Sequence, residues 1–180
     1  MVHKDWARME EADWHFRRLV RRFVKERDKI AIEGVSLPGM LILNAILRDG
    51  EQRLGDLAEQ LDFTSGAVTA ICDKLEKQGY AIRRRSEADR RSVALHITEE
   101  GRRMVERNWA AGTYMIDTIF GTFTPDELET QILFFRKLHD RLEGFAEGVL
   151  RQTKSLDDGT AAGTSEQNTE LQRTNRFISY

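Results

Sequence analysis

The chain has 180 residues, of which 40 % are hydrophobic and 32 % are charged, so it is long enough for one domain with a buried core. Its single cysteine excludes an intramolecular disulfide framework and zinc sites built from four thiolates. The longest nearly apolar stretch, 39–47, is far shorter than the roughly 20 residues that span a bilayer, and residues 1–6 do not resemble a secretory leader. We therefore expect a cytoplasmic protein with no membrane partner.

The net charge of −2 hides an uneven distribution along the chain. Residues 64–91 contain seven basic and four acidic side chains, whereas residues 108–180 contain seven basic and eleven acidic ones. Local charge, rather than the total, sets the electrostatic field beside a binding surface. The total charge therefore neither favours nor excludes a nucleic-acid partner.

Two long helices are predicted in the amino-terminal part. Apolar side chains at helical spacing predict a first helix over about 5–31, ended by Gly34. Ser36 is a suitable N-cap for a second helix, which carries Pro38 in its first turn and ends at Asp49-Gly50. This second helix is apolar almost all round, and we expect it at the centre of the domain.

Two short helices and a hairpin follow. Apolar positions predict a two-turn helix from about residue 53, a turn at Asp62-Phe63, and a helix that Thr64 caps and Gly79 closes. Two strands are then predicted around the polar turn 86–89, one from Tyr80 to Arg85 and one through Val93, Leu95 and Ile97. Two short helices joined by a tight turn and followed by a hairpin predict a helix-turn-helix with a wing.

The carboxyl-terminal part is predicted to be helical, with a polar end. A third long helix is expected over Thr98–Phe120, and residues 124–127 have the pattern of a capping box with proline in the first turn. The last helix carries apolar residues from Leu128 to Val149 in steps of four and three, which is typical of a coiled-coil seam. The composition of 152–180 predicts a flexible polar tail.

The helix after Thr64 is predicted to present small side chains to solvent. Its apolar positions should point inward, and these are Val68, Ile71, Cys72 and Leu75. The opposite face then includes Ser65, Gly66, Thr69, Ala70 and Asp73. Small residues allow a helix backbone to approach base edges, and hydroxyl groups can hydrogen-bond to bases or phosphates. The alternative is an ordinary surface helix whose small residues face a neighbouring helix.

The predicted hairpin is rich in arginine, and its members are Arg83, Arg84, Arg85, Arg90 and Arg91. Arginine suits a narrow minor groove because that groove concentrates negative potential. Asp89 could hold Arg91 in one orientation through a bidentate pair. An arginine-rich strand alone is usually a solvated strand, but directly after a helix-turn-helix it favours duplex DNA as the partner.

Residues 54–101 resemble the winged helix-turn-helix of the MarR family of bacterial regulators. The resemblance rests on the wing and following helix, with the sequence DRRSVALHITEEG at 89–101. It rests also on residues of the two short helices, which are Leu57-Ala58, Val68-Thr69, Asp73-Lys74-Leu75-Glu76 and Gly79. The resemblance implies a mainly α fold with a small β wing. A winged helix-turn-helix over 36–98 would lie between dimerisation helices at 1–35 and 99–151.

The family resemblance also implies a function and a set of site residues. Two copies would interlock through their first and last helices and bind an imperfect palindrome in double-stranded DNA, as a homodimeric repressor. The DNA-binding residues would be Arg53, Ser65, Gly66, Ala67, Thr69, Ala70, Lys74, Arg84, Asp89, Arg90 and Arg91. The dimerisation residues would be Phe16, Leu19, Phe23, Leu128, Ile132, Phe135, Leu138, Leu142 and Phe145.

The chain departs from the family at positions 65 and 70, where many members have Lys or Arg and this chain has Ser65 and Ala70. More of the specificity is then expected from DNA shape and from the wing. The loss of these cations motivates an alternative function, a winged-helix module that binds other proteins without reading DNA sequence. Family members often release DNA when a small aromatic or amphipathic effector binds, and the sequence does not locate a pocket for one.

Redox, metal and enzymatic functions are not expected. Cys72 lies on the apolar side of its helix, which favours a buried, inert thiol over a redox switch. The four histidines lack metal-ligand spacing. The sequence contains no glycine-rich phosphate loop, no Gly-x-Ser-x-Gly and no metal-ligand helix motif, so neither a cofactor nor an active site is predicted.

Overall fold

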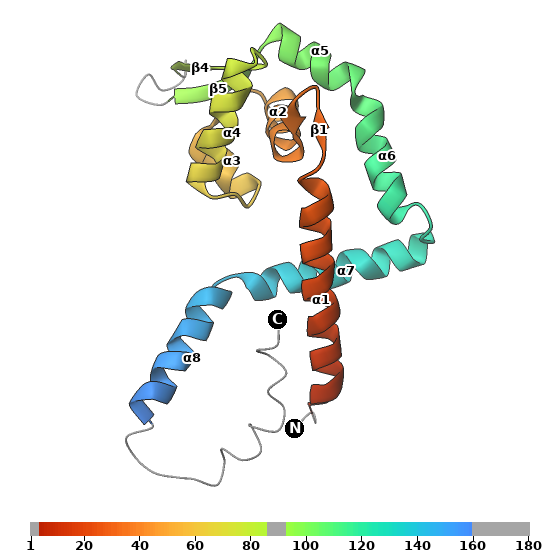
Figure 1. The fold of residues 1–180 in the computed structure, drawn as a ribbon, viewed down its shortest axis with the longest axis vertical. Helices are drawn as coiled ribbons and strands as arrows, with labels where there is room; N and C mark the ends of the chain where they lie inside the picture. Colours follow the sequence, from red (N-terminus) through yellow and green to blue (C-terminus); the bar gives the residue numbers. More distant parts are fainter. Residues whose placement is uncertain (1–3, 86–92, 160–180) are drawn as a thin grey trace. The chain divides into compact units, whose positions relative to one another are not determined.

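A computed structural model describes residues 4–85 and 93–159, and it is mostly helical (Figure 1). The chain divides into two compact units between Thr118 and Ile119. The first contains α1 (Trp6–Arg27), β1 (Ala31–Ile32), β2 (Val35–Ser36), α2 (Leu37–Asp49), β3 (Gln52–Arg53), α3 (Leu54–Gln60), α4 (Ser65–Lys77), β4 (Ala81–Arg85), β5 (Val93–Ile97), α5 (Glu99–Arg107) and most of α6 (Trp109–Phe120). The second contains α7 (Pro125–Leu142) and α8 (Phe145–Gly159).

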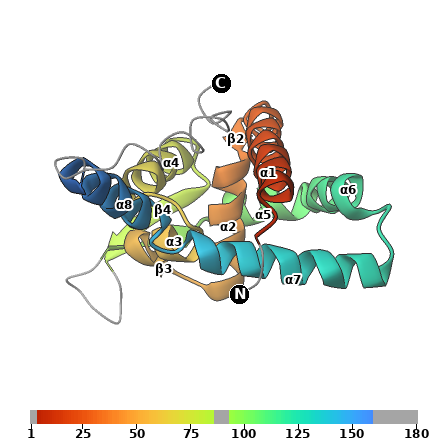
Figure 2. The ribbon, with the colours of Figure 1, turned by 90° about the horizontal axis from the view of Figure 1, so that it is seen from below.

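The hydrophobic core of the described residues lies between positions 35 and 105. Ile42 and Leu43 on α2 are fully buried, as are Leu57 on α3 and Val68 on α4, which confirms the central place predicted for the second helix. Figure 1 shows α2, α3 and α4 gathered beside the β4–β5 hairpin, and Figure 2 shows the same group from below, with β3 close to α3. The winged helix-turn-helix is therefore the packed part of the chain.

The two short helices are held by the caps that the sequence predicts. The Thr64 hydroxyl accepts a hydrogen bond from the Ala67 amide at 3.2 Å, and Ser36 caps α2 in the same way. Asp62, with φ of 52°, turns the chain between α3 and α4, and the Phe63 amide donates to the Ala58 carbonyl at 2.9 Å. This bond closes the end of α3, so the tight turn of the helix-turn-helix is confirmed.

The wing is a three-stranded antiparallel sheet with the order β3-β5-β4. The two predicted strands are confirmed, but β3 is an additional strand of two residues, too short to show an alternating pattern. On the central strand β5, Ala94 and Leu95 project to opposite faces of the sheet, and both are buried. Predicted alternation along β5 is therefore only partly seen, and Val93 is 48 % exposed.

A tight contact attaches the wing to α5. The Thr98 hydroxyl accepts a hydrogen bond from the Gly101 amide at 3.0 Å and donates one to the Gly79 carbonyl at 2.7 Å. The Thr98 amide also donates to the Tyr80 carbonyl at 3.0 Å. A β-carbon at position 101 would lie 2.1 Å from the Tyr80 oxygen, so only glycine fits there. This contact explains the Thr and Gly of the motif at 89–101.

The first helix is shorter than predicted. It ends at Arg27, and the residues expected to continue it to 31 enter the β1–β2 hairpin, in which Ala31 pairs with Ser36. Glu33 and Gly34 have φ values of 50° and 80°, so Gly34 belongs to the hairpin turn rather than to the end of a helix. Strands of two residues leave no periodic signal in the sequence, so the helical spacing of α1 does not reveal where the helix ends.

Two predicted long helices are each broken into a pair. The helix expected over 98–120 is interrupted at Asn108, whose side-chain amide donates to the Met104 carbonyl at 2.9 Å and to Glu33 Oε1 at 2.6 Å. The last helix, expected to carry apolar residues from Leu128 to Val149 without a break, is interrupted at Gly144, with φ of 64°, although the Thr124 capping box that opens it is confirmed. The apolar seam from Leu128 is thus divided between α7 and α8.

Residues 152–159, which the sequence assigns to a flexible polar tail, are helical. Helix α8 continues to Gly159, and residues 160–180 lie outside the described part of the chain. Among the helices of residues 4–85 and 93–159, none has the length and hydropathy needed to span a membrane.

Candidate nucleic-acid interface

Helix α4 exposes the face that its sequence predicts. Val68, Cys72 and Leu75 are buried, and Ile71 is half-buried. Ala67 and Lys74, which were not predicted on the opposite face, are exposed. The residues predicted for the opposite face are all exposed as well, and they are Ser65, Gly66, Thr69, Ala70 and Asp73. Their orientation is confirmed, whereas their contact with DNA stays a prediction.

Two hydroxyl groups near the start of α4 already take part in hydrogen bonds of the helix. Thr69 Oγ1 donates to the Ser65 carbonyl at 2.9 Å, and the Thr64 hydroxyl caps the helix. Donation to the backbone leaves the Thr69 oxygen able only to accept a further hydrogen bond. The exposed face therefore offers mainly methyl groups and hydroxyl oxygens, and Lys74 adds a cation farther along.

Two predicted DNA-binding arginines lie on one face of the wing sheet. Arg53 on β3 and Arg84 on β4 are both paired with Ala94 on the central strand. Directly paired residues project to the same side of a sheet, and two strand spacings separate these arginines by about 10 Å. Both are exposed, while Ala94 between them is 2 % exposed. The sheet thus carries two cations side by side on this face.

Three further predicted residues, Asp89, Arg90 and Arg91, lie outside the described residues. The proposed orientation of Arg91 by Asp89 therefore stays a prediction. The neighbouring strands of the wing end at Arg85 and begin again at Val93.

Arg83 differs from its neighbours on β4 because its guanidinium group contacts α4. It forms an ion pair with Asp73 at 2.7 Å and a second with Glu76. Partial burial lowers the pKa of Arg83, but the Asp73 hydrogen bond and the Glu76 charge outweigh it, and the pKa is raised above its usual value. The sequence pattern groups Arg83 with the other arginines of the hairpin and does not identify its partners on α4.

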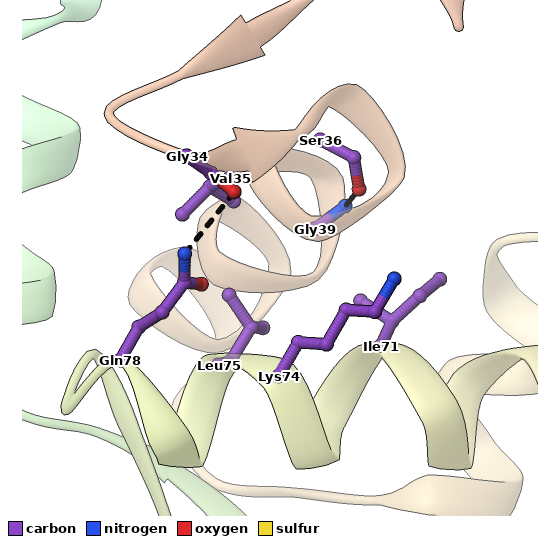
Figure 3. Close-up of a pocket in the computed structure, with 8 residues that line it drawn as sticks. All are labelled: Gly34, Val35, Ser36, Gly39, Ile71, Lys74, Leu75 and Gln78. Carbon is purple, nitrogen blue, oxygen red and sulfur yellow. Dashed lines mark hydrogen bonds between the residues drawn. The ribbon is translucent and has the colours of Figure 1, made fainter.

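A hollow of about 70 Å³ lies between α4 and the start of α2. Figure 3 shows the residues around it, which are Gly34, Val35, Ser36, Gly39, Ile71, Lys74, Leu75 and Gln78. The Gln78 amide crosses the hollow and donates to the Gly34 carbonyl at 3.1 Å. Small-molecule sites usually measure about 300–1,000 Å³, so we assign no effector to this hollow.

Cys72 is fully buried beneath the exposed face of α4. Burial raises the pKa of its thiol to about 11, which keeps the thiol protonated at neutral pH. The interpretation of Cys72 as a buried thiol is confirmed. Among the residues that the structure describes, no group of three or more His, Cys, Asp or Glu side chains could hold a metal ion.

The predicted dimerisation residues are largely exposed in the single chain. Leu19 and Phe23 on α1 are 60 % and 51 % exposed, and Phe135 on α7 is 44 % exposed. Ile132, Leu142 and Phe145 are also exposed, whereas Phe16, Leu128 and Leu138 are half-buried. Neither α1 nor α7 has a buried residue.

The fold and the exposed faces define a winged helix-turn-helix protein, and sequence comparison identifies its family. The model of the MarR family matches residues 33–92. YwhA of Bacillus subtilis, described as an uncharacterized HTH-type transcriptional regulator, is 30 % identical over 97 residues, which cover 54 % of this chain and 70 % of YwhA. The chain belongs to the MarR family, a family of transcriptional regulators rather than enzymes.

The match to other curated relatives covers a smaller part of them. YkoM of Bacillus subtilis, an HTH-type transcriptional regulator, is 30 % identical over 96 residues, or 53 % of this chain. The chain spans 62 % of YkoM and 58 % of the related YfiV.

Solved structures confirm the fold. FabT of Streptococcus pneumoniae, solved in complex with DNA, has a TM-score of 0.57 and 25 % identity, with 78 % of this chain and 99 % of FabT covered. BpsR of Bordetella bronchiseptica, whose DNA binding is regulated by 6-hydroxynicotinic acid, has a TM-score of 0.60 and 21 % identity, with 69 % and 98 % covered.

Proposed function

We propose that this protein is a DNA-binding transcriptional regulator that acts as a homodimeric repressor in the cytoplasm. One observation carries the proposal: the small-residue face of α4 is exposed, and the sheet that follows α4 carries exposed arginines. In this assignment α4 enters the major groove. Its contacts come from Ser65, Gly66, Ala67, Thr69 and Ala70, with Lys74 near the phosphates.

We assign the wing to the DNA backbone and the minor groove next to the major groove that α4 enters. Arg53 and Arg84 would bind phosphates through two cations on one sheet face. Arg91, with Arg90 beside it and Asp89 as its orienting partner, would enter the minor groove. FabT, which has the same fold, has been solved with DNA, and this supports a DNA partner here.

Dimerisation is proposed from the exposed apolar side chains. Exposed apolar side chains on a helix face commonly mark an interface, and such side chains are present on α1, at Leu19 and Phe23, and on α7, at Phe135. A two-fold dimer would present two α4 helices about one helical turn of DNA apart, which predicts an imperfect palindrome as the operator.

Release by a small aromatic or amphipathic effector is the regulatory part of the proposal. The likeness to BpsR, whose DNA binding responds to 6-hydroxynicotinic acid, supports it. A panel of aromatic carboxylic acids, titrated into the protein–DNA complex, should contain compounds that release the DNA. A panel that leaves DNA binding and thermal unfolding unchanged would contradict regulation by this class of compound.

The main experiment begins with duplexes selected from a random DNA library by the wild-type protein. We expect enrichment of a palindromic sequence and a Kd that rises steeply with salt, because bound phosphates release counterions. Arg84→Gln should weaken binding. It should also lower by about one the salt slope, which is the slope of log Kd against the logarithm of the salt concentration. The matched control is Arg102→Gln, which removes the same charge from an exposed position of α5 and should leave the Kd unchanged.

Failure to enrich any duplex would contradict the proposed function and would favour the alternative, a winged-helix module that binds proteins. Equal effects of Arg84→Gln and Arg102→Gln would show that only total charge matters, and they would contradict the assigned face. Arg91→Ala provides a second variant, for which we expect a steep loss of operator binding with an unchanged circular dichroism spectrum.

A further inference from the structure

A cluster of charged side chains connects the wing to the recognition helix α4. The guanidinium group of Arg83 on β4 lies between the carboxylates of Asp73 and Glu76 on α4. Arg83 Nη2 also approaches the Thr69 carbonyl at 3.4 Å. One side chain of the wing therefore contacts two successive turns of the helix.

The backbone of β4 takes part in the same connection. Strand β4 lies at the edge of the sheet, and the Arg83 amide donates to Glu76 Oε1 at 2.6 Å. An unpaired amide on an edge strand would otherwise need water or another chain. Glu76 thus binds the Arg83 main chain and side chain together, and it fixes the position of the strand as well as the rotamer of the arginine.

The neighbouring arginine has the opposite environment. Arg84 projects from the other face of the strand and is exposed, whereas the Arg83 side chain is 24 % exposed and the Glu76 side chain 27 %. The two adjacent arginines of β4 therefore have different roles. Arg84 is available to a polyanion, and Arg83 is neutralised by two carboxylates.

We propose that Arg83 is a positioning residue that does not contact DNA but fixes the orientation of α4 relative to the wing. The inference rests on the proposed function, in which α4 and the wing bind adjacent grooves. Binding residues on two elements act together only when their relative geometry is held closely, because an ångström of displacement separates one of them from its groove. The cluster of Asp73, Glu76 and Arg83 supplies that constraint.

Substitution of Glu76 separates positioning from simple electrostatics. If Arg83 were a phosphate ligand, Glu76→Gln would remove a nearby negative charge and free the arginine, and DNA affinity would rise. If Arg83 instead has a positioning role, Glu76→Gln weakens the connection between α4 and β4, and DNA affinity falls. The two mechanisms predict changes of opposite sign.

The test compares Arg83→Gln, Glu76→Gln and the double variant with the wild type, on a duplex selected by the wild-type protein. Each single variant should raise the Kd by about tenfold, the effect of losing one charged hydrogen bond, and leave the salt slope unchanged. The double variant should have a Kd no higher than that of either single variant, because both substitutions remove the same connection between α4 and β4. Arg84→Gln is the matched control, and it should lower the slope by about one.

Additional measurements separate loss of positioning from loss of folding. Circular dichroism and molecular mass should be unchanged in each variant. If Arg83→Gln fails to fold, Glu76→Gln carries the test, because its side-chain oxygen can still accept the Arg83 amide proton. Arg83→Lys should recover part of the affinity, since an ammonium group can pair with one carboxylate but not bridge both.

Three results would overturn the inference: a salt slope lowered by about one in Arg83→Gln, a higher affinity in Glu76→Gln, or additive losses in the double variant. Each of these requires that the wild type selects a duplex, and so each leaves the proposed function intact. A wild-type protein that selects no duplex would overturn the proposed function, and the inference with it.

Discussion

At the scale of single residues, the contact between Gly101 and the Tyr80 carbonyl is a tight steric constraint. A β-carbon at position 101 would lie 2.1 Å from that oxygen, which is backbone and cannot rotate away. The first turn of α5 is therefore fixed against the turn that follows α4. Glycine is needed here for close approach, and not for an unusual φ.

We expect Gly101→Ala to lower the free energy of unfolding by about 1–3 kcal/mol, because the added methyl group must displace backbone. Urea denaturation measures this change. Gly55→Ala is the matched control, since a β-carbon there meets nothing within 4 Å and alanine is the better helix former. Equal stability of the two variants would contradict the steric account.

Cys72 provides a second prediction at this scale. Because the thiol is fully buried and its pKa is raised to about 11, we expect native protein at pH 8 to react with a thiol reagent only as fast as it unfolds. The measurement compares labelling rates in buffer and in denaturant. Rapid labelling of the native protein would contradict the buried position.

At the scale of elements, a cluster around Glu33 connects the β1–β2 hairpin to the end of α5. Arg107 Nε donates to Glu33 Oε1 at 2.8 Å, and the Asn108 amide donates to the same oxygen at 2.6 Å. Hydrogen bonds from Arg107 and then Asn108 lower the pKa of the Glu33 carboxyl group to about 2. The cluster lies where α5 ends, so it helps to set the break between α5 and α6.

The pKa of Glu33 predicts how pH changes stability. A carboxyl group with a lowered pKa in the folded state stabilises the fold above its unfolded value of 4.5, and this contribution is lost as pH falls toward about 2. Glu33→Gln should therefore have a lower Tm than the wild type at pH 7, and the two values should converge as the pH falls through this range. Glu106→Gln, exposed on α5, is the control. A Tm difference independent of pH would contradict the linkage.

At the scale of the whole molecule, the described chain has one packed region and several unpacked helices. Every member of the described core lies between positions 35 and 105, while α1, α6 and α7 contain no buried residue. A helix gains most of its stability from burying an apolar face, so these helices need another surface. A second copy of the chain meets that need in the proposed dimer.

We expect Phe135→Asp to convert a dimer into a monomer, because it places a charge in the apolar face of α7. Sedimentation or light scattering measures the mass. DNA affinity should fall by more than tenfold, since a monomer binds only one half-site. Arg136→Asp, at an exposed neighbouring position, is the control and should remain a dimer. A wild-type monomer, or a dimeric Phe135→Asp, would contradict the proposed interface.

Local signals determined much of this fold. Ser36, Thr64 and Thr124 act as N-caps, and the apolar spacing of α2 and α4 identifies the faces that are buried. Each of these signals involves only a few neighbouring residues, so it can be recognised from the sequence. The exposed face of α4 and the two long strands of the wing follow from the same periodicities.

Only the tertiary structure decided features that depend on distant partners. The two-residue strands exist because Ala31 pairs with Ser36 and Arg53 with Ala94. The helix break at Asn108 depends on a carboxylate at Glu33, far away in the sequence. In the wing the sequence presents a row of equivalent arginines. Contact with α4 neutralises Arg83 and leaves Arg84 exposed, because a strand alternates its faces and only one of those faces meets the helix.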